Sequence, residues 1–164
     1  MNIFYLDEDP INCAKYLCDQ HLRKMIVETA QLLSNCWPED IAPYKRFGYN
    51  HPCSKWAQYN RKHYVYLVEL FHNYLGEFEY RFNKGHKCAE LNFSVAAFGW
   101  FDKNFEAFQK PPQVMPAMHV DSSTVVAYRN YYRDKMTEWQ SRDKKIIPKW
   151  TNRAVPGWLE GVIL

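Results

Sequence analysis

One long stretch of the chain constrains the fold more than any other. Between Pro52 and Asn83 there is no further proline and only one glycine, Gly76. Large side chains recur there at the spacing of one helix face over roughly eight turns. They are Trp56, Tyr59, His63, Tyr66, Leu67, Leu70, Phe71, Tyr74, Leu75 and Phe78. The pattern predicts one long helix over 52–83 whose apolar face must be buried against other helices.

A second helical stretch, Cys18–Cys36, has both an apolar face and a polar one. Its apolar face consists of Leu22, Met25, Ile26, Leu32, Leu33 and Cys36. A polar stripe follows at steps of three and four, made of His21, Lys24, Glu28, Gln31 and Asn35. Residues at these steps share one side of a helix, and the small side chains of Val27, Ala30 and Ser34 flank them. We therefore expect a half-buried line that carries an imidazole, an ammonium and a carboxylate.

The remaining segments complete an all-α prediction. Asp9–Pro10 is a typical helix start, and it predicts a helix to about Cys36 that is interrupted at most near Cys18–Gln20. A capped start at Asp121–Ser123 predicts a last helix over about 122–140. Residues 92–118 are rich in aromatic residues and proline and predict a long irregular loop. Strand patterns are weak everywhere, so the expected architecture is a small helical bundle.

Length and composition bound the class of protein. At 164 residues the chain is expected to form a single domain, 1–164, with a substantial core. Five cysteines without a C-x-x-C pair argue against disulfides and a structural zinc site, so we expect neither metal nor cofactor. No long apolar run and no secretory signal is visible, so we expect no membrane partner. We expect a cytoplasmic location, which is the host cytoplasm if the protein is phage-encoded. A net charge of +3 is compatible with DNA or a nucleotide as partner.

Glu28 is the main candidate for chemistry. A carboxylate on a half-buried line can act as an acid, a base or a stabiliser of a cation, although an i,i+4 ion pair with Lys24 on the surface has the same spacing. His21 lies two turns earlier and is either a pocket residue or a packing residue. His51 stands at the start of the predicted long helix, where it and Asn50 suit either an anion or a simple capping turn.

Lys24 is a candidate for substrate binding beside Glu28, and so are three residues from other segments. Arg81 follows Glu77 by four residues, which indicates either a structural ion pair or one wall of a charged pocket. Gln113 lies in the stiff segment PPQVMP and either presents its amide to a ligand or belongs to a rigid loop. Trp56 lies in a run of alternating basic and aromatic residues, 44–64, which suits phosphate contacts and base stacking but equally suits a core.

Short motifs resemble a known enzyme family. Asp-Gln-His-Leu at 19–22 and a glutamate seven residues after the histidine resemble the first long helix of the phage-type pyrimidine-dimer DNA glycosylases, the endonuclease V type. His51 matches a histidine ahead of their second long helix, and Pro148-Lys149-Trp150 matches a Pro-x-Trp near their C-terminus. Over most of its length the chain also resembles a group of uncharacterised small phage proteins, through NIFYLDEDP, ETAQLL, NHP, PPQVMP and YRNYY.

The first resemblance implies a single-domain, mostly helical and metal-free enzyme. In that family the N-terminal α-amine attacks the sugar C1′, displaces the base and forms an imine. The matching amine here is that of Met1, because Asn2 is large enough that the initiator methionine is usually kept. Glu28 would stabilise the sugar cation and assist the later elimination, and His21 with nearby basic side chains would hold phosphates. α-Amines as a class are partly unprotonated near neutral pH, so such an attack is chemically reasonable.

The chain also departs from the family. The arm from Asn2 to His21 is longer, and Thr29, Ala30 and Gln31 stand where the family has basic residues. We therefore expect a glycosylase-like protein that cleaves an N-glycosidic bond in damaged or modified DNA, with lyase activity if the amine attacks and without it if water does. The alternatives are a non-catalytic phage protein that binds nucleic acid or a nucleotide, and a phage–host interaction protein whose polar stripe is a solvated face. The sequence does not indicate an oligomeric state.

Overall fold

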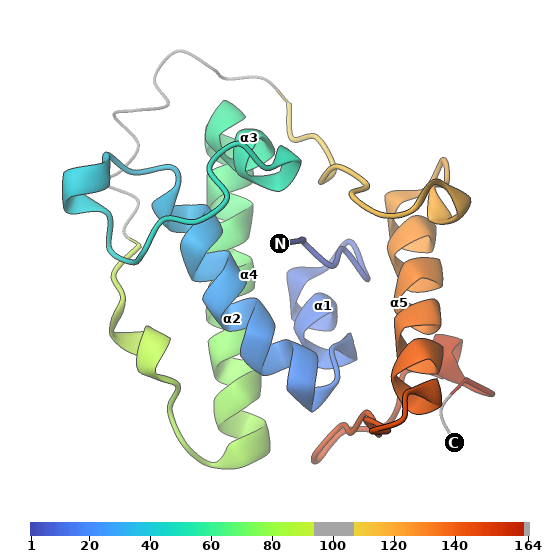
Figure 1. The fold of residues 1–164 in the computed structure, drawn as a ribbon. Helices are drawn as coiled ribbons and strands as arrows, with labels where there is room; N and C mark the ends of the chain where they lie inside the picture. Colours follow the sequence, from blue (N-terminus) through green and yellow to red (C-terminus); the bar gives the residue numbers. More distant parts are fainter. Residues whose placement is uncertain (94–106, 163–164) are drawn as a thin grey trace.

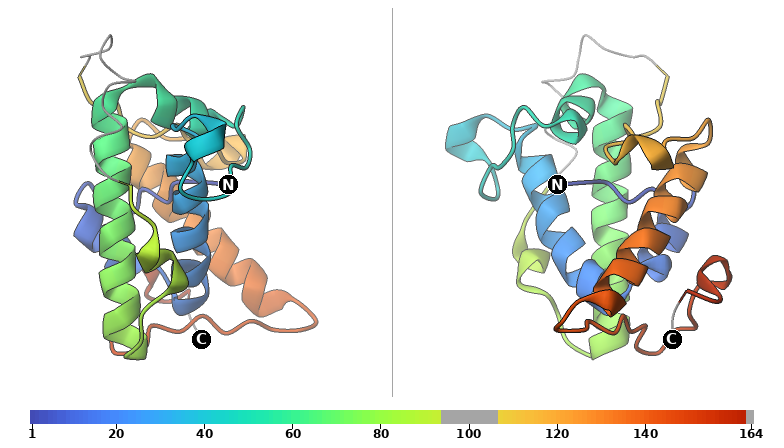
Figure 2. Two further views of the ribbon diagram at one scale, coloured as in Figure 1. Left: turned by 90° about the vertical axis from the view of Figure 1, so that its left-hand side faces the viewer. Right: turned by 45° about the vertical axis from the view of Figure 1, so that its right-hand side comes forward.

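The protein is described by a computed structural model that covers residues 1–93 and 107–162 (Figure 1, Figure 2). Within these ranges it has five α-helices and no β-strand, so the all-α prediction is confirmed. The helices are α1 (Pro10–Tyr16), α2 (Asp19–Ser34), α3 (Pro52–Tyr59), α4 (Arg61–Phe82) and α5 (Thr124–Ser141). Short 3₁₀ helices are η1 (Glu39–Ile41), η2 (Lys87–Glu90), η4 (Ala117–His119) and η5 (Gly157–Leu159). No described helix is long and apolar enough to cross a membrane.

Capping residues divide both of the long helices that the sequence predicts. Asp9 caps α1 as expected, but Leu17 and Cys18 are extended and separate α1 from α2. The prediction of one helix over 52–83 is wrong, because Asn60 adopts φ −145° and ψ 135° between α3 and α4. Its side chain accepts a hydrogen bond from the backbone N–H of Lys62. Asparagine competes with helix propagation by such local hydrogen bonds, and apolar periodicity does not reveal the interruption.

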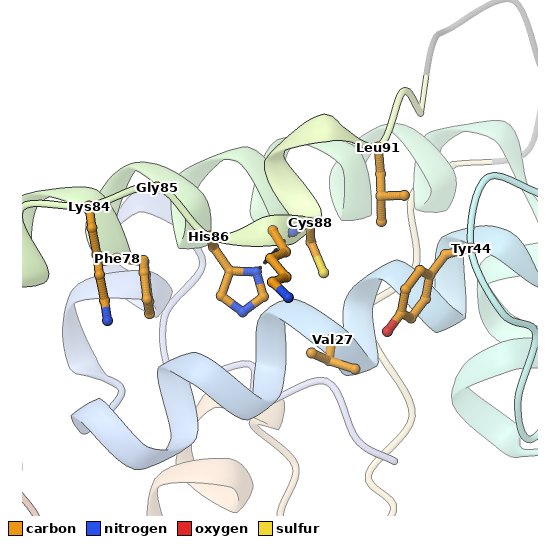
Figure 3. A pocket seen from close by; sticks show the side chains of 9 residues that line it. Val27, Tyr44, Phe78, Lys84, Gly85, His86, Cys88 and Leu91 are labelled. Carbon is orange, nitrogen blue, oxygen red and sulfur yellow. Dashed lines mark hydrogen bonds between the residues drawn. The ribbon is translucent and has the colours of Figure 1, made fainter.

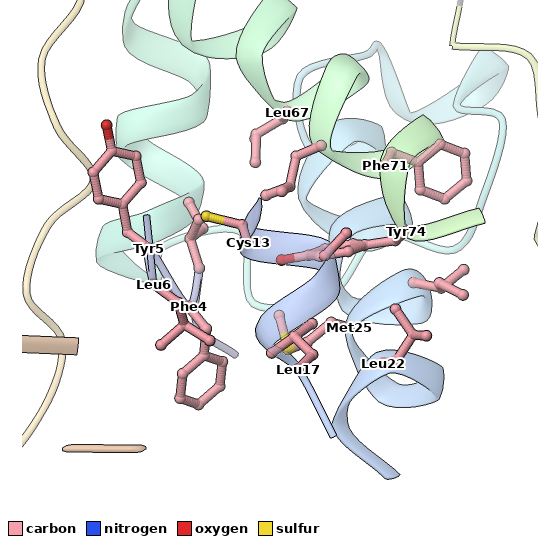
Figure 4. Close-up of a cluster of buried hydrophobic side chains, with 14 of the residues drawn as sticks. Phe4, Tyr5, Leu6, Cys13, Leu17, Leu22, Met25, Leu67, Phe71 and Tyr74 are labelled. Carbon is pink, nitrogen blue, oxygen red and sulfur yellow. The ribbon is translucent and has the colours of Figure 1, made fainter. Parts of the chain in front are cut away.

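Helix α4 is the centre of the bundle. It packs against α1, α2 and α3, and its buried side chains meet those of α1 and α2 in a continuous apolar core (Figure 4). Residues 3–6 are buried in the same core, where Tyr5 and Leu6 lie on the side of Cys13 (Figure 4). The N-terminal arm is therefore a packed element rather than a loose tail.

Helix α5 and the C-terminal tail close the bundle from the other side. Tyr132 of α5 meets Phe4 edge-to-face at 5.4 Å between ring centroids, so the N-terminal segment lies between α2 and α5 (Figure 1). In the tail, Trp150 donates its indole N–H to the carbonyl of Tyr16 at 3.0 Å, which fixes the tail to the α1–α2 corner. The predicted irregular loop, 92–118, lies partly outside the described residues. Its described end, 107–116, has no regular structure before η4.

Candidate functional site

The side chain of Asn2 fixes the start of the chain. Its Nδ2 donates to the carbonyl of Val114 at 2.7 Å. Its Oδ1 accepts from the backbone N–H of Ile3 at 3.0 Å, and the hydroxyl of Tyr128 lies 2.7 Å from the same oxygen. The thiol of Cys53 is also within reach, at 3.9 Å. These partners come from three distant segments, so they hold Asn2 in one place. The α-amino group of Met1, one residue earlier, therefore has a defined position beside α3.

Gly48 provides the room that Met1 occupies. A Cβ at residue 48 would stand 2.5 Å from the ε-carbon of Met1, closer than side-chain atoms approach one another. Gly48 also has φ +60°, a conformation that side chains with a Cβ rarely adopt. Its Cβ position is 3.7 Å from the Cβ of His51, so the methionine side chain lies in the turn that precedes α3.

His51 caps α3, and the charge of the Met1 α-amino group acts on its ring. Its Nδ1 accepts a hydrogen bond from the backbone N–H of Cys53 at 3.2 Å. Burial, and then the positive charge of the Met1 amine, lower the pKa of His51 below its usual value, while the charge of Glu28 acts in the opposite direction. A neutral imidazole whose Nδ1 accepts must carry its proton on Nε2. His51 therefore offers one Nε2–H donor near the start of the chain.

Glu28 lies in the same neighbourhood. Its side chain is 16% exposed, and Lys24 Nζ, on a side chain that is 63% exposed, is 3.4 Å away. An ion pair with so exposed a partner contributes little stability, about 0.5 kcal/mol or less. Burial raises the pKa of the Cys53 thiol to about 11, and both the Met1 amine and Glu28 act on this thiol, with opposite signs. The charges of Met1 and Glu28 thus act on both His51 and Cys53, so Met1, Glu28 and His51 form one candidate group, with Lys24 as the ion-pair partner of Glu28.

His21 lies in the core and not with this group. Its ring is 3% exposed, stacks on Phe4 at 5.1 Å and lies against Trp139 at 4.6 Å. Burial, followed by the charges of Lys135 and Lys24, lowers its pKa to about 3. The expectation that His21 holds a phosphate is therefore corrected. The N-terminal segment and α5 cover the ring and keep it neutral.

Arg81 is also corrected, since its guanidinium is used to hold the fold. It is 3% exposed and donates to Glu77 at 2.7 Å and to Asp19 at 3.0 Å. Further donors reach the carbonyls of Leu17 at 2.7 Å and Lys15 at 2.9 Å. Arg81 therefore joins α4 to the α1–α2 corner and has no donor directed at a ligand within the described part of the chain.

Two other predicted binding residues brace the irregular loop. Trp56 is buried, stacks on His63 at 4.2 Å and donates its indole N–H to the carbonyl of Gln109 at 3.0 Å. The amide of Gln113 pairs with the backbone of Asp121 in both directions, at 2.6 and 2.9 Å. Both side chains are thus engaged within the protein, whereas Asn50 is exposed in the turn before α3.

Comparison with known proteins places the chain in a family. The sequence model of the pyrimidine dimer DNA glycosylase family matches residues 1–90. The chain belongs to this family. No curated protein and no solved structure matches it. The matched range contains Met1, Glu28 and His51, so the whole candidate group lies in the family region, while α5 lies outside it.

Sequence reasoning missed the residues that position the terminus. Asn2 and Tyr128 are 126 positions apart, and no local pattern links them. Only Gly48 gave a local signal, since a glycine in GYNHP is compatible with a left-handed turn. The family match does not include Tyr128, so the glycosylase region of this chain is supported by a residue from beyond it.

A separate apolar cavity lies on the neighbouring face of α2 (Figure 3). It has a volume of about 540 Å³ and is lined by Val27, Tyr44 and Phe78, with Lys84, His86 and Lys87 from the segment after α4. Glu28 does not line it. Among residues 1–93 and 107–162, no three histidine, cysteine, aspartate or glutamate side chains are grouped as a metal site would require.

Proposed function

We propose that this member of the family cleaves the N-glycosidic bond of a pyrimidine dimer in DNA, with the Met1 α-amine as nucleophile and Glu28 as the group that stabilises the sugar cation. One observation carries the proposal. The charges of Met1 and Glu28 both act on His51 and on Cys53, and Asn2 fixes the terminus at this place. A fixed amine loses less entropy on attack than a mobile one.

In the first step the lone pair of the Met1 amine attacks C1′ and the bond from C1′ to the base nitrogen breaks. The base leaves with that electron pair and takes up a proton. Glu28, as a carboxylate, stabilises the positive charge on the sugar and accepts the proton that the amine releases. Glu28 then returns this proton to O4′ as the sugar ring opens, which gives the protonated imine between the amine and C1′ and restores the carboxylate.

Lyase activity follows from the same imine. Glu28 removes a proton from C2′, and the electron pair expels the 3′ phosphate by β-elimination. His51 can hold a phosphate oxygen through its Nε2–H, and Lys24 and Lys55 add positive charge nearby. We propose that residues 1–164 act as one domain, since α5 holds the terminus through Tyr128.

Trapping with borohydride tests the nucleophile. Wild-type protein, incubated with duplex DNA that carries a cyclobutane pyrimidine dimer, should give a covalent adduct on reduction, and peptide mass analysis should locate it at Met1. Base release without an adduct would show that water is the nucleophile. If neither occurs and dimer DNA is still bound, the protein is a binding module and the proposal is wrong.

Glu28→Gln tests the carboxylate. It keeps the shape of the side chain but removes its negative charge, so base release should fall by about 10²-fold or more. Duplex binding, measured by fluorescence anisotropy, should stay near the wild-type value. Lys24→Gln is the matched control, because it removes the ion-pair partner of Glu28 and leaves the carboxylate in place. An equal loss of binding and base release in Glu28→Gln would contradict the assigned role.

A further inference from the structure

The cavity between α2 and the segment after α4 combines an apolar lining with basic groups (Figure 3). Its apolar lining comes from Val27 of α2, Phe78 of α4, and Cys88 and Leu91 in and just after η2. Burial raises the pKa of the Cys88 thiol, so this side chain stays uncharged and acts as a small apolar group. A volume of about 540 Å³ suits one small molecule.

His86 supplies one oriented donor to this cavity. Its Nδ1 accepts a hydrogen bond from the backbone N–H of Cys88 at 3.1 Å, and its ring lies edge-on to Phe78 at 5.1 Å between centroids. Burial lowers the pKa of His86 below its usual value, so the imidazole is neutral near neutral pH and carries its proton on Nε2. No residue in the described ranges accepts a hydrogen bond from this N–H.

The basic groups of the cavity have no acidic counterpart. Lys84 and Lys87 line it, and neither forms an ion pair within the part of the chain that the structure describes. Tyr44 lies at the opposite end from Lys84, and its hydroxyl has no hydrogen-bond partner among residues 1–93 and 107–162 (Figure 3). None of the described lining residues is an aspartate or a glutamate. The cavity therefore offers positive charge and free N–H and O–H donors, which favour an anion.

These two properties together define the ligand. A free phosphate would use the donors but leave the apolar lining in contact with water, and a neutral hydrocarbon would do the reverse. We propose that the cavity binds a small amphiphilic anion, a carboxylate or sulfonate with an apolar body. Its charged end lies between His86 and the two lysines, and its body covers Val27, Cys88 and Leu91. The site does not depend on chemistry at Glu28, which does not line the cavity.

A matched pair of dyes tests the site. 8-Anilinonaphthalene-1-sulfonate and N-phenyl-1-naphthylamine share one ring system, and only the first carries an anion. Both fluoresce more strongly in apolar surroundings, so a titration gives their dissociation constants. The sulfonate should bind to the folded protein at least about tenfold more tightly, the effect of one hydrogen bond to a charged group. Equal affinities, or no binding of the sulfonate at about 1 mM dye, would refute the proposal.

Two lysine substitutions locate the charged end. The double variant Lys84→Gln/Lys87→Gln removes both ammonium groups, so it should bind the sulfonate about tenfold more weakly and the neutral dye as the wild type does. Lys145→Gln/Lys149→Gln is the matched control, because it removes the same charge from exposed residues that do not line the cavity. An equal loss of sulfonate binding in both double variants would show general attraction to a basic protein and would contradict the assignment.

Val27→Phe locates the apolar end. The larger ring takes up part of the cavity, so both dyes should bind at least about fivefold more weakly. Val65→Phe is the matched control, since Val65 is 40% exposed on α4 and does not line the cavity. It should bind both dyes as the wild type does. Unchanged binding in Val27→Phe would place the dyes elsewhere and overturn the proposal.

Competition experiments identify the ligand class and separate this site from the glycosylase proposal. Decanoate should displace the bound sulfonate, whereas equal displacement by decanol would show that no anion is required and would refute the proposal. A duplex that contains a pyrimidine dimer should leave the dye bound, and displacement would make the cavity part of the DNA-binding surface. Glu28→Gln should bind the dye as the wild type does, so either proposal can fail while the other stands.

Discussion

The hydroxyl of Tyr128 links a helix outside the family region to the start of the chain, and Tyr128→Phe removes this link together with the hydroxyl's contact to Pro112. The hydroxyl lies 2.7 Å from Oδ1 of Asn2 and 2.6 Å from the carbonyl of Pro112, and Tyr128 is fully buried. Loss of a buried hydrogen bond of this kind costs about 1–2 kcal/mol. For a chain of this size the melting temperature should fall by about 2–4 °C for each kcal/mol.

The effect on chemistry should exceed the effect on stability. With Tyr128→Phe, Asn2 keeps its bonds to Val114 and to the backbone N–H of Ile3 but loses the contact between its Oδ1 and α5. If the amine is displaced by about 1 Å, imine formation should slow by up to about 10²-fold. The assay is single-turnover borohydride trapping on dimer-containing DNA, at a temperature where the variant is fully folded.

Tyr132→Phe is the matched control for this experiment. Tyr132 is also a fully buried tyrosine of α5, and its hydroxyl accepts a hydrogen bond from the backbone N–H of Cys18 at 2.9 Å. This variant should lose similar stability and trap DNA at the wild-type rate. Equal slowing in both variants, or an unchanged rate in Tyr128→Phe, would refute the idea that the tyrosine positions the amine.

Two further predictions concern the packing of the N-terminal segment. Gly48→Ala introduces a Cβ at φ +60° against Met1, so it should lower the free energy of unfolding in urea by about 1–2 kcal/mol and should also lower the trapping rate. Gly85→Ala is the control, because a Cβ there meets nothing within 4 Å, and it should change neither quantity. His21 has a folded-state pKa lowered to about 3, so its contribution to stability is complete above its unfolded pKa of about 6.5 and is lost as the pH falls towards 3. NMR titration should show the ring neutral down to pH 5, roughly two units above that pKa, and protonation near pH 6.5 would contradict this assignment.

Local patterns predicted the parts of the fold that depend on local interactions. The apolar periodicity of 18–36 identified α2, and Asp9 gave the correct start of α1. The apolar periodicity of 52–83 continues across Asn60 and therefore predicted one helix there. Asn60 instead ends α3, and its side chain caps α4. A hydrogen bond of one side chain sets that helix boundary. Apolar periodicity is a property of many residues together, so it does not detect the effect of one residue.

The candidate site was predictable only in part for a similar reason. Glu28 was expected to be half-buried, and its 16% exposure agrees with that expectation. His21 shares the stripe with Glu28, yet Phe4 and Trp139, from segments far apart in the sequence, cover its ring. Arg81 has the i,i+4 partner that the sequence indicated, but its contacts to the α1–α2 corner arise from tertiary structure alone. Which face of a helix is polar is a local property, whereas what packs on that face is not.

The bond between Asn2 and Tyr128 has a consequence for biosynthesis. Residue 2 leaves the ribosome early, but its partner is made 126 residues later. The proposed nucleophile is thus the first group to be synthesised and the last to be positioned. A nascent or truncated chain that ends near residue 90 contains Glu28 and His51 but lacks the support for its own terminus. The proposed attack on C1′ would therefore become possible only once α5 is complete. An affinity tag fused ahead of Met1 would prevent the attack, because it converts the amine to an amide.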